Sequence, residues 1–374
     1  MATIIDGSLT PRGEKISFPN GMKWYQSNIT SGDFYSIYYA NGLWVASSYA
    51  NKGLYYSIDG KTWQQSNITS DNVPSVYNAN GLWVAAGNGI YYSTNGKTWT
   101  QNNDMSANFN SVYNSNGIWV AGSYAGLYYS ANGKTWTKSS SIAENFGSVY
   151  SANGIWVVGC YGSGGGLYYS TDGKNWTQSN ISSDDFERIY NANSLWVAAS
   201  TNQGLYYSTD GKSWTRSNIT SDSFSSVYYA NGIWVAGSNH GLYYSTDGKN
   251  WTQSNIAVEV FYSVYNANGI WIAGSNHGLY YSTDGKNWTQ SNITSNEFES
   301  VYNANGIWIA GSDSGLYYSP TWEVSTTPRS VSEEWVLKSS VNMTSPVDLS
   351  YQSINVEFQS ALQDYSKIRF NVSG

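Results

Sequence analysis

The chain contains few of the residues on which many proteins build their chemistry. Of its 374 residues one is cysteine (Cys160), two are histidine and 11% are charged, against about 25% charged residues in an average soluble domain. A single cysteine excludes a disulfide framework and a cysteine-based metal site. The net charge of −7 argues against partners such as nucleic acid or anionic membranes, because binding phosphates requires clustered Lys and Arg.

Long apolar runs are also missing. No stretch approaches the roughly 18 apolar residues of a membrane-spanning helix, and residues 1–15 contain no apolar core of a secretory signal. No segment of the repeat described next shows the 3.6-residue apolar period of a helix. We therefore expect an all-β protein that is made in the cytoplasm without a signal peptide and does not insert into a membrane.

One phrase is repeated eight times and fills most of the chain. Its clearest copy is residues 227–256, VYYANGIWVAGSNHGLYYSTDGKNWTQSNI. Its first tryptophan recurs every 36 to 40 residues, at Trp44, Trp83, Trp119, Trp156, Trp196, Trp234, Trp271 and Trp308. A period of this length is typical of propellers and solenoids.

The sixth copy illustrates how one repeat forms four strands. Residues 224–229, 233–236, 242–245 and 250–253 are short, β-prone and bounded by turn residues. The Asn231-Gly232 pair between the first two strands predicts a hairpin whose turn residues both need positive φ. Four antiparallel strands in about 38 residues match one propeller blade.

The ends of the repeat region predict how the ring closes. Residues 20–24 resemble the start of a fourth strand, whereas residues 316–319 form a third strand that Pro320 follows. We therefore predict an eight-bladed β-propeller of four-stranded antiparallel blades, closed by the N-terminal strand as by Velcro.

The predicted domain boundaries follow from where the repeat begins and stops. They are a lead-in at 1–19, the propeller at 20–322, a linker at 323–334 and a small C-terminal β module for docking or oligomerisation at 335–374.

The turn between the third and fourth strands carries a family resemblance. Ser245–Trp251 (STDGKNW) resembles the Asp-box, the bacterial neuraminidase repeat of sialidases, although the usual pattern has one more residue between Asp and Gly. Asn95 and Asn132 replace the aspartate in two copies. We interpret the motif as a structural turn, capped by the Asp and packed by the Trp.

The resemblance does not extend to catalysis. Sialidases bind the substrate carboxylate with three arginines, and the arginines here are Arg12, Arg188, Arg216, Arg329 and Arg369. Only Arg188 lies on an expected inner strand, so we predict no catalytic residues, no cofactor and no enzyme activity. A sialidase-like glycan-processing enzyme is the alternative.

Candidate binding residues lie on one face of the expected disc. The loops between second and third strands and the crossings between blades share this face and vary from copy to copy, which is where binding residues can differ without cost to the core. The expected ligand-binding residues are Tyr49, Tyr124, Tyr161, His240, His277, Asp222 and Glu259. Aromatic rings that stack on sugars, beside acids and amides, suit a cell-surface glycan.

Two other features are candidates for chemical sites. His240 and His277 occupy equivalent loop positions, and without carboxylate partners near them in the sequence they make a poor metal site. Cys160 has no surrounding His and Asp arrangement. We therefore predict no metal site. Acids also precede the inner strands in seven copies: Asp33, Asp104, Glu144, Asp185, Asp222, Glu259 and Glu297.

The C-terminal residues suggest a biological setting. Trp335 to Leu337, Phe358 to Ser360 and Tyr365-Ser366 are similar to short β modules at the C-termini of tailed-bacteriophage tail and fibre proteins. The resemblance implies a virion component, a tail fibre or receptor-binding protein, with a cell-surface glycan or receptor, other virion proteins and further copies of itself as partners. A scaffold or capsid decoration protein without glycan binding is the other alternative.

Overall fold

The computed structural model describes residues 23–320 except 50–51, 103–104, 106, 140–143 and 163–164, and four short strands outside that range. The chain divides into two units, Asn20–Trp322 and a second that combines Met1–Pro19 with Glu323–Gly374. In the second unit β1 (Ser8–Leu9) pairs with β2 (Lys15–Ile16), and β35 (Trp335–Leu337) pairs with β36 (Phe358–Ser360). The predicted lead-in, linker and module lie mostly outside the described residues, as does Asp104.

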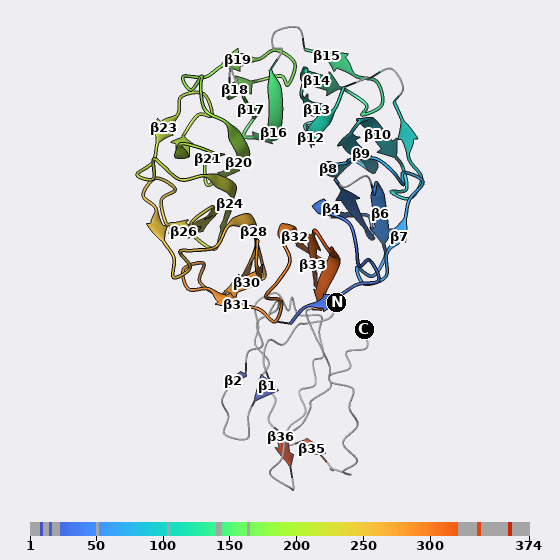
Figure 1. The fold of residues 1–374 in the computed structure, drawn as a ribbon, viewed down its shortest axis with the longest axis vertical. Coiled ribbons are helices and arrows are strands. Elements are labelled where there is room, and N and C mark those ends of the chain that lie inside the picture. The colour runs from blue at the N-terminus through green and yellow to red at the C-terminus, as the bar shows by residue number, and fades with distance from the viewer. Residues whose placement is uncertain are drawn as a thin grey trace, which may run out of the picture. The chain divides into compact units, whose positions relative to one another are not determined.

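The first unit is the predicted all-β propeller, with eight four-stranded antiparallel sheets arranged around a ring (Figure 1). The inner strands are β4 (Phe34–Ala40), β8 (Ser75–Ala79), β12 (Phe109–Ser115), β16 (Asn145–Ala152), β20 (Phe186–Ala192), β24 (Phe224–Ala230), β28 (Phe261–Ala267) and β32 (Phe298–Ala304). The second strands are β5 (Leu43–Ser48), β9 (Leu82–Gly87), β13 (Ile118–Ser123), β17 (Ile155–Tyr161), β21 (Leu195–Ser200), β25 (Ile233–Ser238), β29 (Ile270–Ser275) and β33 (Ile307–Ser312).

The third and fourth strands complete each blade. The third strands are β6 (Leu54–Ser57), β10 (Gly89–Ser93), β14 (Gly126–Ser130), β18 (Gly166–Ser170), β22 (Gly204–Ser208), β26 (Gly241–Ser245), β30 (Gly278–Ser282) and β34 (Gly315–Pro320). The outer strands are β7 (Gln64–Gln65), β11 (Thr100–Gln101), β15 (Thr137–Lys138), β19 (Thr177–Gln178), β23 (Thr215–Arg216), β27 (Thr252–Gln253), β31 (Thr289–Gln290) and β3 (Tyr25–Gln26). We number the blades from 1 (β4 to β7) to 8 (β32 to β34, with β3). Among the described residues no helix is long and apolar enough to cross a membrane.

The predicted closure by the N-terminal strand is confirmed. β3 pairs with β34 of the last blade, Tyr25 opposite Tyr318 and Gln26 opposite Tyr317. The amide of Ser27 extends the pairing by donating to the carbonyl of Leu316 at 2.9 Å. Strand pairing therefore joins the first and last blades, so the ring has no unpaired sheet edge where the chain begins and ends.

The Asn-Gly turns also have the predicted conformation. Asn231 has φ 51° and Gly232 has φ 81°, which are the left-handed values that a two-residue hairpin of this kind needs. In blade 5 the glycine is replaced by Ser194, which still has φ 60°.

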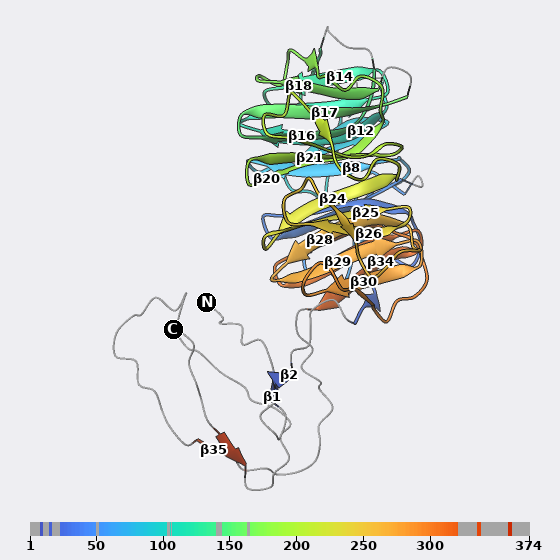
Figure 2. The same ribbon diagram turned by 90° about the vertical axis from the view of Figure 1, so that its left-hand side faces the viewer.

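The core lies between neighbouring blades, whose sheets face one another around the ring (Figure 2). Trp234 of β25 and Trp251 beside β27 are both buried and pack with Leu195 and Val197 of the preceding blade. Burying a large apolar side chain contributes roughly 2 to 3 kcal/mol. Because each tryptophan serves two blades, no blade can form its core alone.

The outer strand is shorter than predicted, with residues 252–253 in place of 250–253. The carboxylate of Asp247 accepts hydrogen bonds from the amides of Lys249 and Asn250, which holds these residues in the turn. The amide of Trp251 then donates to Asn218 Oδ1 at 2.7 Å, and Asn218 Nδ2 donates to the carbonyl of Trp251 at 2.9 Å. The backbone of Trp251 is thus bonded to the crossing between blades and not to β26.

Candidate binding site at the channel mouth

The direction of the strands divides the disc into two faces. The Asn-Gly turns and the turns around Asp247 lie on one, which we call the turn face. The loops between second and third strands and the crossings between blades lie on the other, which we call the loop face. Every inner strand begins at the loop face, so its first residues surround the mouth of the central channel.

The first residues of the inner strands form a repeated β-bulge. In seven blades the pairing register shifts just after a phenylalanine near the start of the strand, as between Phe224 and Ser226 in blade 6. The residue inside the bulge is left unpaired, and bulges of this kind re-aim a side chain. The bulge residues are Tyr35, Asn110, Gly147, Glu187, Ser225, Tyr262 and Glu299, and Pro74 precedes β8 in blade 2.

Our sequence-based prediction missed this ring of bulge residues, although a signal for it existed. The bulge position holds six residue types in eight copies, whereas the position before it is Phe in seven copies and the position after it is Ser in seven. A variable position between two constant ones, at the mouth of a channel, is where blades of one design can differ in what they bind.

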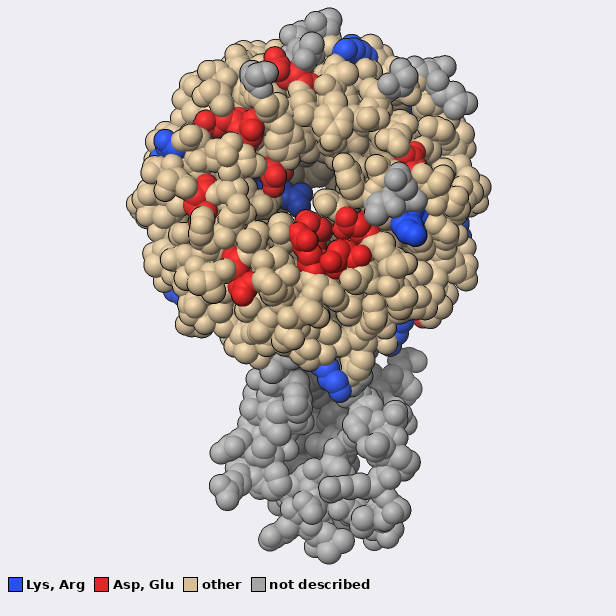
Figure 3. All heavy atoms as spheres, in the orientation of Figure 1, with Lys and Arg blue, Asp and Glu red and all other residues tan. Residues whose placement is uncertain are grey.

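Acidic side chains gather on the rim between blades 8 and 1, as the loop face shows near β32 and β4 (Figure 3). Burial, followed by the charges of Glu297 and Asp33, raises the pKa of Glu299 to about 8. Burial, Asp313 and Glu297 likewise raise the pKa of Asp33. Glu297 also hydrogen-bonds Tyr262. At neutral pH the Glu299 carboxyl therefore holds its proton for most of the time.

Exposed tyrosines stand beside this rim. The rings of Tyr35 and Tyr49 lie 5.2 Å apart between centroids, and a hydrogen bond links the hydroxyls of Tyr49 and Tyr124. Tyr35 is 38% exposed, Tyr49 42% and Tyr124 53%. The structure therefore brings together two of the predicted residues, Tyr49 and Tyr124, and adds Tyr35.

Tyr161 lies further around the mouth, at the junction of blades 4 and 5. Its ring covers Gly147, where a Cβ would come within 1.8 Å of the ring. The ring stands near Glu187 and Arg188, whose charges act on its hydroxyl after the larger effect of burial, and the pKa of Tyr161 is raised. Because the bulge residue of blade 4 is glycine, the ring of Tyr161 can lie over the inner strand.

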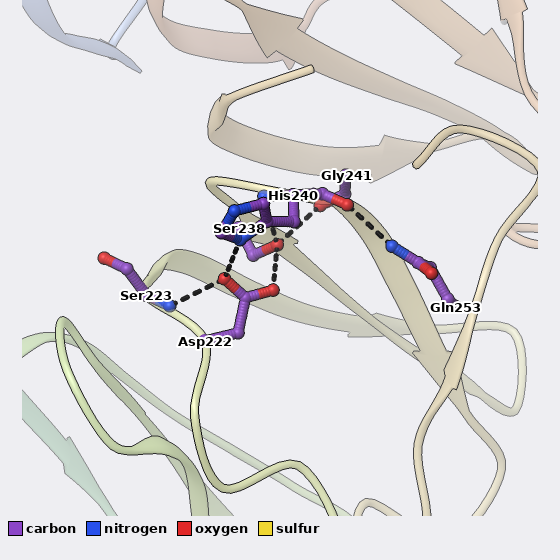
Figure 4. A network of polar contacts seen from close by, with 6 residues as sticks. All are labelled: Asp222, Ser223, Ser238, His240, Gly241 and Gln253. Atoms are coloured by element: carbon purple, nitrogen blue, oxygen red, sulfur yellow. Dashed lines mark hydrogen bonds and ion pairs between the residues drawn. The ribbon is translucent and has the colours of Figure 1, made fainter. Parts of the chain in front are cut away.

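The two histidines have carboxylate partners, contrary to our expectation. His240 Nδ1 lies 2.8 Å from Asp222 Oδ1 (Figure 4), and His277 Nδ1 lies 2.8 Å from Glu259 Oε2. Asp222 and Glu259 each lie 18 residues before their histidine. The strand pairing of the blade brings them together, which local sequence could not show.

Asp222 is bonded from several sides. The Ser238 hydroxyl donates to its Oδ2 at 2.8 Å and the Ser223 amide donates to its Oδ1 at 2.8 Å (Figure 4). Only 6% of the residue is exposed, whereas the side chain of His240 is 73% exposed. The geometry therefore gives Asp222 a structural role and leaves the histidine free to meet a partner on the loop face.

A closed ring of tyrosines lines the channel nearer the turn face. Neighbouring rings lie between 4.7 Å (Tyr228 and Tyr265) and 5.7 Å (Tyr38 and Tyr302) apart. Each also meets the tryptophan of the next blade edge-on, as Tyr190 meets Trp234. The ring consists of Tyr38, Tyr77, Tyr113, Tyr150, Tyr190, Tyr228, Tyr265 and Tyr302. It joins all blades around the channel.

The described part of the chain offers few side chains for metal binding or thiol chemistry. No group of three His, Cys, Asp or Glu side chains there is arranged to hold a metal ion. Cys160 is fully buried, and burial raises the pKa of its thiol. A buried thiol of this kind is unreactive.

Comparison with known proteins supports the fold and nothing finer. No protein-family model and no curated protein sequence matches the chain. The computationally designed Ika8 protein is similar over 79% of this chain and 98% of its own, with TM-score 0.64 and 10% identity. BamB from Moraxella catarrhalis covers 80% and 98%, with TM-score 0.59 and 9% identity. YCF48, in its structure bound to D1 peptide, covers 83% and 98%, with TM-score 0.54 and 13% identity.

These likenesses define the class of protein. The chain is an eight-bladed β-propeller, a fold that is consistent with a binding or structural role. When the sequence identity is this low, the activity or partner of one propeller cannot be assigned to another.

Proposed function

We propose that this chain is a non-enzymatic binding protein that recognises its partner at the channel mouth of the loop face. One observation carries the proposal. Five large hydrophobic side chains are exposed among the described residues, and three of them are the adjacent Tyr35, Tyr49 and Tyr124. An exposed group of tyrosines on a rigid ring is typical of an interaction site, because each ring offers a large apolar face and a polar tip.

The chemistry of the mouth suits a carbohydrate. The faces of Tyr35 and Tyr49 can stack on the C–H face of a pyranose ring, and the nearby Asp33 and Asp313 can accept hydrogen bonds from its hydroxyl groups. A cell-surface glycan, or a glycan on a cell-surface receptor, is therefore the partner that we propose.

The proposed setting is a bacteriophage virion. The resemblance of the C-terminal residues to phage tail and fibre modules supports this setting. In it the propeller acts as a tail-fibre or receptor-binding component. Residues 335–374 then attach it to other virion proteins or to further copies of itself.

The two alternative functions require different residues or different partners. A sialidase-like enzyme needs several arginines in the channel. The described arginines are Arg188 on β20 and Arg216 on β23, and Arg216 is occupied with Gln203 and the carbonyl of Thr220. A scaffold or decoration protein needs other virion proteins as partners and no glycan.

The test is a glycan array combined with binding of the full chain to whole cells. We expect Y35A/Y49A/Y124A to weaken binding at least 100-fold, since aromatic residues at the centre of an interface each contribute about 2 kcal/mol or more. Val258→Ala is the matched control, because Val258 is another exposed apolar side chain, 84% exposed, in the crossing before β28. Binding that survives the triple change, with normal thermal unfolding, refutes the proposed site.

The array also separates the alternatives. Wild-type binding to cells but to no glycan indicates a protein receptor. Binding to virion proteins alone indicates the scaffold role, and cleavage of an arrayed glycan indicates an enzyme.

A further inference from the structure

One inner strand departs from the others inside the channel. The position after the bulge is serine in seven blades: Ser36, Ser75, Ser111, Ser148, Ser226, Ser263 and Ser300. Several of these serines join one inner strand to the next. Ser300 Oγ donates to the carbonyl of Phe34 at 3.0 Å, and Ser36 Oγ accepts from the amide of Val76 at 3.3 Å. In blade 5 the residue is Arg188, which cannot make this compact bond between strands.

Arg188 on the inner strand β20 is an exposed residue, although protein atoms around its guanidinium displace part of its water. Within the described part of the chain no hydrogen bond or ion pair to its guanidinium is found. Glu187 and Tyr161 act on it only through their charges, and the loss of solvent between the channel walls lowers the pKa of Arg188. A guanidinium that has lost part of its hydration without gaining a partner costs stability.

Three departures from the common blade meet at this point. Arg188 replaces a serine, Gly147 leaves the bulge of blade 4 without a side chain, and Tyr161 fills that space with its ring. Residues that depart from the common blade and lower the stability of the fold are expected to have a functional role. A cation beside an aromatic ring recognises a ligand that carries an anionic group on an apolar frame.

We propose that Arg188 anchors an oxyanion, a carboxylate or a phosphate, carried by the ligand that enters the channel mouth, and that Tyr161 packs against the apolar part of the same ligand. A guanidinium can bond both oxygens of such a group at once, which a lysine cannot. The inference rests on the proposed function, because it names the chemistry of the ligand for the same mouth.

The acidic rim of blades 8 and 1 carries less negative charge at neutral pH than its number of carboxyl groups suggests. Glu299 is largely protonated there, because its pKa is raised to about 8 by burial and by the neighbouring Glu297 and Asp33. Burial also raises the pKa of Glu187, although Ser225 and Arg188 partly counter the rise. Oxyanion binding should therefore weaken as the pH rises above 8 and Glu299 becomes charged.

The test uses the full chain with three sugars as probes: glucuronate, glucose 6-phosphate and neutral glucose. Binding is measured by chemical-shift titration for the wild type and for Arg188→Ser, which restores the residue of the other seven blades. We expect the wild type to prefer one charged sugar over glucose and Arg188→Ser to lose that preference. The loss should be about 10- to 100-fold in affinity, the range for one charge-assisted hydrogen bond. Whichever charged sugar binds more tightly identifies the oxyanion as a carboxylate or a phosphate.

Two further measurements keep the result interpretable. Arg188→Ser should raise the melting temperature, because it removes an unpartnered charge and allows the bond between strands. Arg216→Ser, on the outer strand of the same blade, should leave the preference unchanged. The proposal is overturned if the wild type binds glucose as well as the charged sugars, if Arg188→Ser keeps the preference, or if it unfolds at a lower temperature.

The failure of this inference is distinguishable from failure of the proposed function. Loss of cell binding in Y35A/Y49A/Y124A together with full cell binding in Arg188→Ser overturns the oxyanion anchor and leaves the mouth as the binding site. Full cell binding in both variants overturns both.

Discussion

The closure of the ring can be tested by one substitution, Asn292→Ala. Asn292 in the last crossing bonds the backbone of Trp24, which precedes the closing strand β3. The Trp24 amide donates to Asn292 Oδ1 at 2.6 Å, and Asn292 Nδ2 donates to the Trp24 carbonyl at 2.9 Å. Because β3 has two residues, these bonds are a large part of what holds the closing segment in blade 8.

The structure sets the expected size of the effect. Each hydrogen bond contributes about 1 kcal/mol net, and an amide left buried without a partner adds a further cost. Trp24 is only 2% exposed, so the substitution should cost about 2 to 3 kcal/mol. If the closing segment opens locally, its opening equilibrium should shift about 30- to 150-fold.

Asn218→Ala is the matched control, because Asn218 makes the same two bonds to Trp251 in the middle of the chain. Hydrogen exchange followed by mass spectrometry is the assay. In Asn292→Ala residues 23–29 should exchange about 30-fold faster or more, whereas Asn218→Ala should leave that segment unchanged and loosen its own blade. Equal exchange of residues 23–29 in the wild type and in Asn292→Ala would refute the reasoning.

Two further predictions concern pH. Burial would raise the pKa of Asp247, but hydrogen bonds from Asn250 and Lys249 outweigh it and hold this pKa well below the usual value, and the pKa of Asp284 falls to about 2 in the same way. A depressed carboxylate pKa stabilises the fold above the unfolded pKa near 4 and ceases to do so as the pH falls through the folded pKa. We therefore expect that replacing the turn aspartates by Asn, the residue at Asn95, reduces the loss of unfolding free energy between pH 4 and 2, measured by urea unfolding. An unchanged loss contradicts a stabilising role of the turn aspartates. The raised pKa of Glu299 changes stability in the opposite direction, because its ionisation is disfavoured in the folded state. Glu299→Gln should gain melting temperature over the wild type progressively from pH 5 to pH 8 and keep the gain at pH 9, and a constant difference at all pH values argues against a protonated Glu299.

The fold could be predicted from the sequence because its determinants are local. The Asn-Gly pairs fix left-handed turns, as at Asn231 and Gly232, and the repeat length fixes four strands per blade. The split ends of the repeat then leave one strand to close the ring, and β3 does so. Each of these features lies within one repeat or at its ends.

The sequence-based predictions are wrong where residues that are far apart in the sequence bond to one another in the folded blade. The outer strand starts at Thr252 because Asn218, 33 residues earlier, takes the amide and carbonyl of Trp251. His240 gains Asp222 as a partner because the crossing lies beside the loop once the blade is folded. Neither contact can be predicted from local sequence, since each joins residues that only the folded blades bring together.

The candidate site was predicted only in part. Tyr49 and Tyr124 were identified because they are aromatic residues in variable loops. The bulge residues and the tyrosine ring were missed, because an inner strand that faces a channel has the same alternating pattern as one packed in a core. Variation between copies at an otherwise constant strand would have revealed the bulge position.

The near-eightfold symmetry of the ring explains where recognition can be located. Some residues make equivalent contacts around the ring, such as Trp234 and its counterparts in every blade, and the clasp between Asn218 and Trp251, which recurs with both bonds in six blades. Their contribution to stability accounts for these residues. A ligand that is not itself eightfold must distinguish blades, so it has to contact positions at which they differ. In the channel these positions cluster at two junctions, around Tyr35 and Glu299 between blades 8 and 1, and around Tyr161 and Arg188 between blades 4 and 5. The two junctions lie four blades apart on a ring of eight, so a ligand that spans the mouth meets aromatic rings at both ends and a free cation at one. This asymmetry gives the ligand a single orientation, which a uniform ring could not do.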